Sequence, residues 1–143
     1  MSVRRVDQGM AEAAARILPR TVSKELRTRY RQLRVMTHTA GLAATYAFIA
    51  AKEGEENELA AAYRGVGEGI RRRLGELGLL PGNAAGMNAR EVLAEFGRMD
   101  IVRYARASAD VTAFTGWLAR LADAAYQGDA ASGRRDAARD SGS

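Results

Sequence analysis

The sequence predicts an all-α protein, a compact bundle of about five to six helices in a single domain. Apolar residues recur at steps of three and four over most of the chain, which is the spacing of one helix face. No stretch shows the alternating β-branched residues of a strand. A length of 143 residues suits one modest core, and we assign the helical domain to residues 1–127.

The first helix is expected over about residues 4–18, and Pro19 ends it because proline disfavours helix in the residue before it. Ser23 suits the N-cap of a second helix, which reaches about Ala51. Gly41 lies within that span. The sequence leaves open whether the helix runs through this glycine or bends there.

A third helix is expected after the polar break at residues 54–57, with a core stripe from Leu59 to Leu77. A connector with proline and glycines spans 77–88. Asn88 and Glu91 then form a capping-box pair that starts a short fourth helix.

The last helix has the most regular repeat, and its stripe runs from Ile101 to Ala125. Phe114 and Trp117 widen this stripe, so we predict that both are core residues; the alternative is a platform for stacking nucleic-acid bases. Residues 128–143 contain no large apolar residue, which predicts a disordered tail.

A row of cations follows the second helix at alternating steps of four and three residues. This spacing keeps the whole row on one narrow face. Apolar residues such as Tyr30 and Leu33 lie on the opposite face, which we expect to be buried. The row consists of Arg20, Lys24, Arg27, Arg31, Arg34 and His38.

The distribution of charge favours an anionic partner for this face. Residues 1–52 contain ten lysines and arginines against three acids, a net charge of +7, whereas residues 53–143 have a net charge of −2. A solvated surface without a partner would mix the two signs. We therefore predict that Arg20, Lys24, Arg27, Arg31 and Arg34 contact nucleic acid.

The segment Gly65-Val-Gly67-Glu-Gly69 has the glycine content of a phosphate-binding loop but lacks the preceding strand and the lysine. We expect it to be helical, with the glycines at a close helix crossing inside the fold or between copies. Arg71 and Arg72 are further candidates for nucleic-acid contact, since at most two of three consecutive arginines face one way.

Several classes of function are unsupported by the sequence. No cysteine is present, so disulfides and thiolate metal sites are excluded and a reducing cytoplasm is expected. No apolar run approaches the roughly 20 residues of a membrane span, and no secretory signal is recognisable. His38, the only histidine, is predicted to be a polar boundary residue. We expect no catalytic residue, metal, cofactor or small-molecule substrate.

The order of these features resembles the small subunit of type III-B (Cmr-type) CRISPR RNA-guided effector complexes, over roughly residues 5–127. The motifs are Gly41–Leu42 with Ala47–Phe48, and a late tryptophan, Trp117, followed by a basic and apolar run. One departure is Arg34, which stands where family members often have a proline seven residues before the glycine. This adds a cation and predicts a softer bend.

The resemblance implies a non-catalytic structural subunit whose copies stack into a minor filament beside the backbone subunits. Its partners would be guide RNA, target RNA, the other subunits and further copies of itself. Two alternatives stay open at this point, a helical DNA-binding regulator and a helical protein–protein adaptor. Against the regulator, the cationic row extends over five turns and no turn with a recognition helix is evident.

Overall fold

The computed structural model describes the backbone of residues 3–141 and the side chains of residues 8–126. No strand occurs in this described backbone, which confirms the all-α prediction. A short 3-10 helix, η1 (Ala84–Gly86), lies in the connector before the fifth helix. The α-helices are α1 (Val3–Ile17), α2 (Lys24–Thr39), α3 (Leu42–Glu53), α4 (Glu58–Glu76), α5 (Ala89–Arg98) and α6 (Ile101–Ser141).

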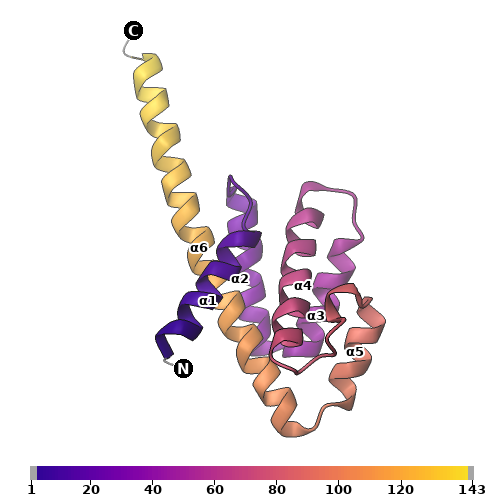
Figure 1. Ribbon diagram of the computed structural model, residues 1–143. Helices are drawn as coiled ribbons and strands as arrows, with labels where there is room; N and C mark the ends of the chain where they lie inside the picture. The colour runs from indigo at the N-terminus through magenta and orange to yellow at the C-terminus, as the bar shows by residue number, and fades with distance from the viewer. Residues whose placement is uncertain (1–2, 142–143) are drawn as a thin grey trace.

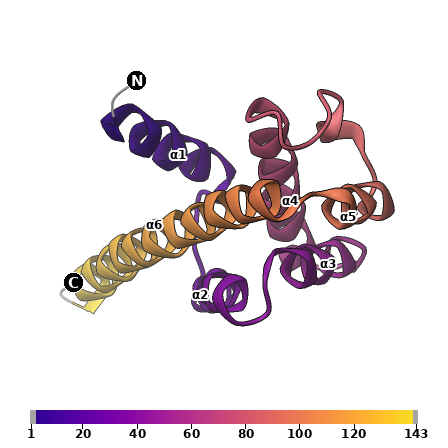
Figure 2. The same ribbon diagram turned by 90° about the horizontal axis from the view of Figure 1, so that it is seen from below.

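Helix α6 lies between α1 and α2 and also contacts α3 and α4. Figure 2 shows α1 along one side of it and α2 along the other, and both helices contact it. Helices α3 and α4 pack against each other, and α5 packs on α3 (Figure 1). The surface between α2 and α6 is therefore formed by segments that are far apart in the sequence.

Large side chains from α3, α4 and α6 meet in one core. Phe114 and Leu118 of α6 are fully buried, together with Tyr46 of α3 and Ile70 of α4. The apolar stripes predicted to face the core do so except near helix ends, where Ile101 is 88% exposed and Leu77 is 44% exposed. Both lie at the end of a helix, where the spacing continues but no neighbouring helix covers the side chain.

Gly41 separates α2 from α3, which answers the question that the sequence leaves open. Its φ is 91°, a conformation that residues with a Cβ rarely adopt. A glycine has no side chain to cap the next helix, and the Tyr104 hydroxyl of α6 accepts the Ala43 N–H instead, at 3.1 Å. Helix α2 is continuous through Arg34, so the chain changes direction at Gly41.

Capping contacts start three helices where the sequence predicts them or close by. The Ser23 hydroxyl accepts the Leu26 N–H at 3.0 Å, so α2 begins at Lys24. The capping box of Asn88 and Glu91 starts α5. The Asn57 side chain caps α4 by accepting the Ala60 N–H, also at 3.0 Å.

Gly65, Gly67 and Gly69 of α4 lie at close approaches inside the fold. A Cβ at Gly65 would be 3.6 Å from Cβ of Ile17, and one at Gly69 would be 3.0 Å from the Phe114 ring. At Gly67 it would be 2.0 Å from the Glu53 carboxylate. The segment is helical, as predicted, and its small residues let α1, α3 and α6 pack closely on α4.

Helix α6 continues past Gly128, where the sequence predicts the start of a disordered tail. Alanine and arginine, which are strong helix formers, are frequent in this segment, so helical geometry is locally favourable. The side chains of 127–143 lie outside the described residues. Disorder of the tail and the domain boundary at residue 127 stay predictions.

Candidate nucleic-acid interface

The cations of the predicted row lie on the side of α2 that is nearest to α6, with one exception in position. Arg20 precedes α2 and lies in the segment that joins it to α1. Arg20, Lys24, Arg31 and Arg34 are exposed, whereas Arg27 is half-buried. On the opposite side of α2, Tyr30 and Leu33 are buried as expected, while Ala40 at the helix end is exposed.

Arg27 is held by an aromatic contact. Its guanidinium lies over the Tyr126 ring of α6, 4.1 Å from the ring centre. Among the described residues its buried Nε atom has no hydrogen-bond partner. One face of this cation is therefore covered by protein, which limits it to contacts through the opposite edge.

Arg31 is neutralised by an acid from α6. Its Nε and Nη2 atoms lie 3.0 Å and 2.9 Å from the same Asp123 oxygen. Both side chains are substantially exposed, so water screens the pair. The row contains no acid of its own, yet the fold places Asp123, which is 92 residues later in the sequence, beside Arg31.

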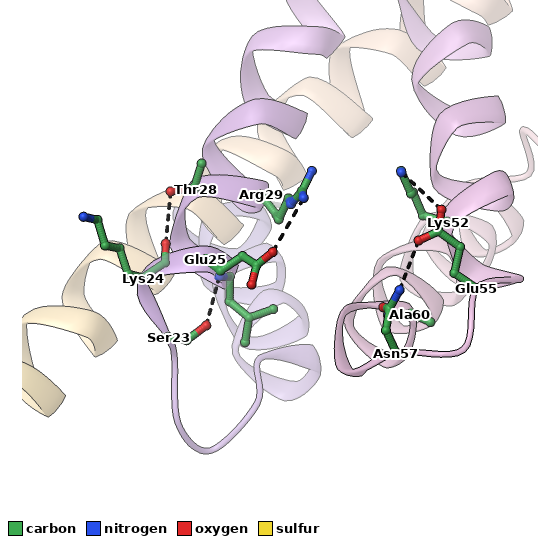
Figure 3. A network of polar contacts seen from close by, with 10 residues as sticks. Ser23, Lys24, Glu25, Thr28, Arg29, Lys52, Glu55, Asn57 and Ala60 are labelled. Carbon is green, nitrogen blue, oxygen red and sulfur yellow. Dashed lines mark hydrogen bonds and ion pairs between the residues drawn. The ribbon is translucent and has the colours of Figure 1, made fainter.

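Three of the predicted cations have no ion-pair partner among the described residues. The side chains of Arg20, Lys24 and Arg34 make no ion pair or hydrogen bond within the described part of the chain. Figure 3 shows the Lys24 ammonium group pointing away from the contacts around the start of α2. These three side chains can approach a phosphate without breaking an ion pair or hydrogen bond to any described residue.

A groove between α2 and α6 extends this surface and contains a cation that sequence reasoning missed. Its volume is about 340 Å³. Arg120 of α6 has no acidic partner among the described residues, and its guanidinium lies 5.4 Å from the centre of the Trp117 ring. Arg120 follows Trp117 by three residues on the same helix, and this spacing was the signal in the sequence that could have indicated their contact. The groove is lined by Arg34, His38, Thr112, Ala113, Gly116, Trp117 and Arg120.

The two aromatic residues of the late helix differ in environment. Phe114 is fully buried, as its prediction as a core residue requires. Trp117 packs against the same core but is partly exposed and lines the groove. His38 is exposed beside it, and no group of three His, Cys, Asp or Glu that could hold a metal ion occurs in the described part of the chain.

Arg71 is placed inside the protein, between α4 and α3. Its side chain is only 14% exposed, and it donates a hydrogen bond to the Tyr46 hydroxyl at 3.0 Å. The Glu53 carboxylate lies 3.9 Å away. Burial raises the pKa of Glu53, although Arg71 and Arg64 act in the opposite direction. A phosphate contact by Arg71 would break its contacts with Tyr46 and Glu53. Arg71 packs against α3 and is not part of the α2–α6 surface.

Arg72 lies apart from the predicted row. It is exposed and pairs with Glu68 at 2.9 Å, one turn earlier on α4. Both residues line a second groove, between α1 and α4, which also contains Glu12 and Glu76. The mixed signs of charge make this groove a weaker site for a polyanion than the α2–α6 surface.

Acidic residues limit the basic surface near the starts of α2 and α4. Figure 3 shows Glu25 paired with Arg29, and Glu55 held by Lys52 and Asn57 at 3.2 Å and 3.1 Å. The hydrogen bond from Asn57 and the contacts with Lys52 lower the pKa of Glu55. Arg29 is thus paired with Glu25 and lies on a different side of α2 from Lys24.

The resulting surface has a defined composition. We call it the basic face; it consists of Arg20, Lys24, Arg34 and Arg120, with Arg31 paired and Arg27 stacked beside them. No helix in the part of the chain that the structure describes is long and apolar enough to cross a membrane.

Comparison with known proteins identifies one family. A family model described as CRISPR-associated protein (Cas_Cmr5) matches residues 3–125, which is most of the chain. The match includes every residue of the basic face. Neither the curated proteins nor the solved structures contain a match to this chain.

Proposed function

The chain belongs to the Cas_Cmr5 family of CRISPR-associated proteins, and we propose that it is a non-catalytic structural subunit of a type III-B effector complex. In this proposal it contacts guide and target RNA through the basic face. The family makes it a component of a Cmr-type complex. The contact with RNA rests on the free charges between α2 and α6.

The observation that carries the RNA contact is the set of uncompensated cations on one face. Arg20, Lys24 and Arg34 are exposed and have no acidic partner within the described residues, and Arg120 faces Arg34 across the groove. Cations of this kind bind phosphates without reading bases, so specificity would be left to base pairing between guide and target.

The proposal includes the protein partners of the subunit. Copies of the chain stack beside the backbone subunits, so that basic faces of successive copies line one RNA channel. A single copy supplies few phosphate contacts, and binding by the isolated chain is therefore weak. The cysteine-free sequence fits action in the cytoplasm.

The test is a triple charge reversal, Arg20→Glu, Lys24→Glu and Arg34→Glu, in the assembled complex. Each lost phosphate contact should lower the slope of log affinity against log salt by about 0.7–0.9, so the triple variant should lower it by about 2–3 for each copy that contacts RNA. Retention of guide and target RNA at moderate salt is the measurement.

A matched control carries the same change of charge on another surface. Arg90, Arg98 and Arg106 are exposed residues of α5 and the first part of α6. Their triple reversal to glutamate should leave the salt slope unchanged. Equal losses in both variants would mean that only total charge matters, and unchanged retention in the basic-face variant would contradict the proposal. A preference for duplex DNA with a defined site would favour a DNA-binding regulator.

A further inference from the structure

The α2–α6 groove differs from the rest of the basic face because it contains a partly exposed aromatic ring. Trp117 is the only tryptophan of the chain, and it forms part of the groove wall together with Thr112. The volume of about 340 Å³ falls within the range of small-molecule sites, roughly 300–1,000 Å³. The groove can therefore hold a group of about the size of one nucleotide.

Two guanidinium groups face this groove from different helices. Arg34 comes from α2 and Arg120 from α6, and neither has an acidic partner among the described residues. By contrast, Arg31 of the neighbouring turn is paired with Asp123. Two of the four uncompensated cations of the basic face thus line the groove that contains the tryptophan.

Gly116 leaves space in the groove. A Cβ built at this position would meet no heavy atom within 4 Å, although the residue lies in the middle of α6. Glycine weakens a helix interior by about 1 kcal/mol relative to alanine. Here its effect on the structure is to keep the groove open beside Trp117.

We propose that the α2–α6 groove binds one unpaired nucleotide of RNA, with the base against Trp117 and the adjoining phosphate between Arg34 and Arg120. This inference rests on the proposed contact of the basic face with RNA. Aromatic rings next to cations are the combination that binds single strands, because every base has a face that can stack.

A paired nucleotide does not fit this site. In an A-form duplex both faces of each base are covered by its neighbours, and only base edges and the backbone are accessible. Arg120 covers the Trp117 ring in the free protein. A base that enters the groove replaces this exposed cation–π contact by the stronger stacking contact and leaves the guanidinium for phosphate.

The experiment uses the assembled complex with target RNA that carries 5-iodouridine at one position at a time. Irradiation couples this base to an aromatic residue stacked on it. The crosslink is expected in the tryptic peptide of residues 107–120, which contains Trp117 and the fully buried Phe114. It should occur when the modified uridine occupies an unpaired position.

Two variants test the groove without removing its charges. Gly116→Leu fills the open space and raises helix propensity, and Trp117→Leu removes the ring. Both should abolish the crosslink and lower RNA affinity by about fivefold or more, the low end of the stacking range. Arg20→Glu, outside the groove, should weaken retention but leave the crosslink of bound RNA in the same peptide.

The outcomes separate this inference from the proposed function. Salt-dependent retention through the basic face without any crosslink in 107–120 would overturn the groove site and leave the proposed function intact. A crosslink that persists in Gly116→Leu would also overturn the groove site. A crosslink in 107–120 that disappears in Gly116→Leu, with retention unchanged by the double reversal Arg20→Glu and Lys24→Glu outside the groove, would support the groove and contradict the wider contact of the basic face.

Discussion

Arg31 of α2 and Asp123 of α6 form an ion pair in which two guanidinium nitrogens approach one carboxylate oxygen, at 2.9 Å and 3.0 Å. The pair lies in the middle of a row of cations that the sequence presents as uniformly free. Of the row's arginines and lysine without an ion pair or aromatic contact among the described residues, Arg20 and Lys24 precede it and Arg34 follows it. The electrostatic attraction of this surface for a polyanion is therefore weaker than the number of arginines indicates.

Replacing Asp123 by Asn should strengthen RNA binding, because it frees the charge of Arg31. We expect retention by the assembled complex to persist to higher salt, with the salt slope steeper by about 0.7–0.9 for each new phosphate contact. Stability should change by less than about 1 kcal/mol, since both side chains are exposed. The matched control is Glu12→Gln, which frees Arg16 on α1 from a similar exposed pair. An unchanged slope in Asp123→Asn would place Arg31 outside the RNA contact.

The ion pair of Arg73 and Asp110 should matter more for stability than that of Arg31 and Asp123. Two hydrogen bonds of 3.0 Å and 2.7 Å join it, and the side chains are only 15% and 12% exposed. Asp110→Ala leaves a buried guanidinium without its partner, so we expect a loss of about 3 kcal/mol in the free energy of unfolding. Urea denaturation should show a loss of less than about 1 kcal/mol for Asp123→Ala. Similar losses in the two variants would contradict this ranking.

Two glycine-to-alanine substitutions in helices should have opposite effects. At Gly69 the new Cβ would lie 3.0 Å from the ring of Phe114, which is fully buried in the core. Overpacking of about 1–3 kcal/mol then exceeds the gain of about 1 kcal/mol in helix propensity. At Gly97 of α5 the Cβ meets no atom within 4 Å. Thermal unfolding should show a lower midpoint for Gly69→Ala and a higher one for Gly97→Ala, and the reverse order would contradict the packing at α4.

The pH dependence of stability should differ in sign between Glu53 and Glu55. Burial raises the pKa of Glu53 in the folded state, so its contribution is present below the unfolded value of about 4.5 and is lost as the pH rises through the raised pKa. The pKa of Glu55 is lowered by Asn57 and Lys52, so its contribution is present at higher pH and is lost as the pH falls.

The measurement is the unfolding free energy from about pH 3 to about pH 7 for the protein and the variants Glu53→Gln and Glu55→Gln. Relative to Glu53→Gln, the unmodified protein should lose stability as the pH rises. Relative to Glu55→Gln it should gain stability over the same range. Two differences of the same sign would show that the environments of these carboxyl groups are wrongly assigned.

Local interactions made much of the fold predictable. The N-cap at Ser23 and the capping box of Asn88 and Glu91 involve residues three positions apart, and both occur as predicted. The stripe of α6 is correct except at its exposed first residue, Ile101, because helical spacing alone does not show where the neighbouring helices end. Whether the second helix continued beyond Gly41 depended on packing, including the cap that Tyr104 provides.

The sequence by itself determined the all-α class and the row of cations on one side of α2, because both follow from composition and spacing along the chain. The family follows from the match over residues 3–125. Only the tertiary structure decided which of these charges are free. Asp123 lies 92 residues from Arg31, and Arg120 reaches the groove from α6. Ion pairs form over a few ångströms in space, so the helix packing that brings α6 beside α2 determines which cations remain available to RNA.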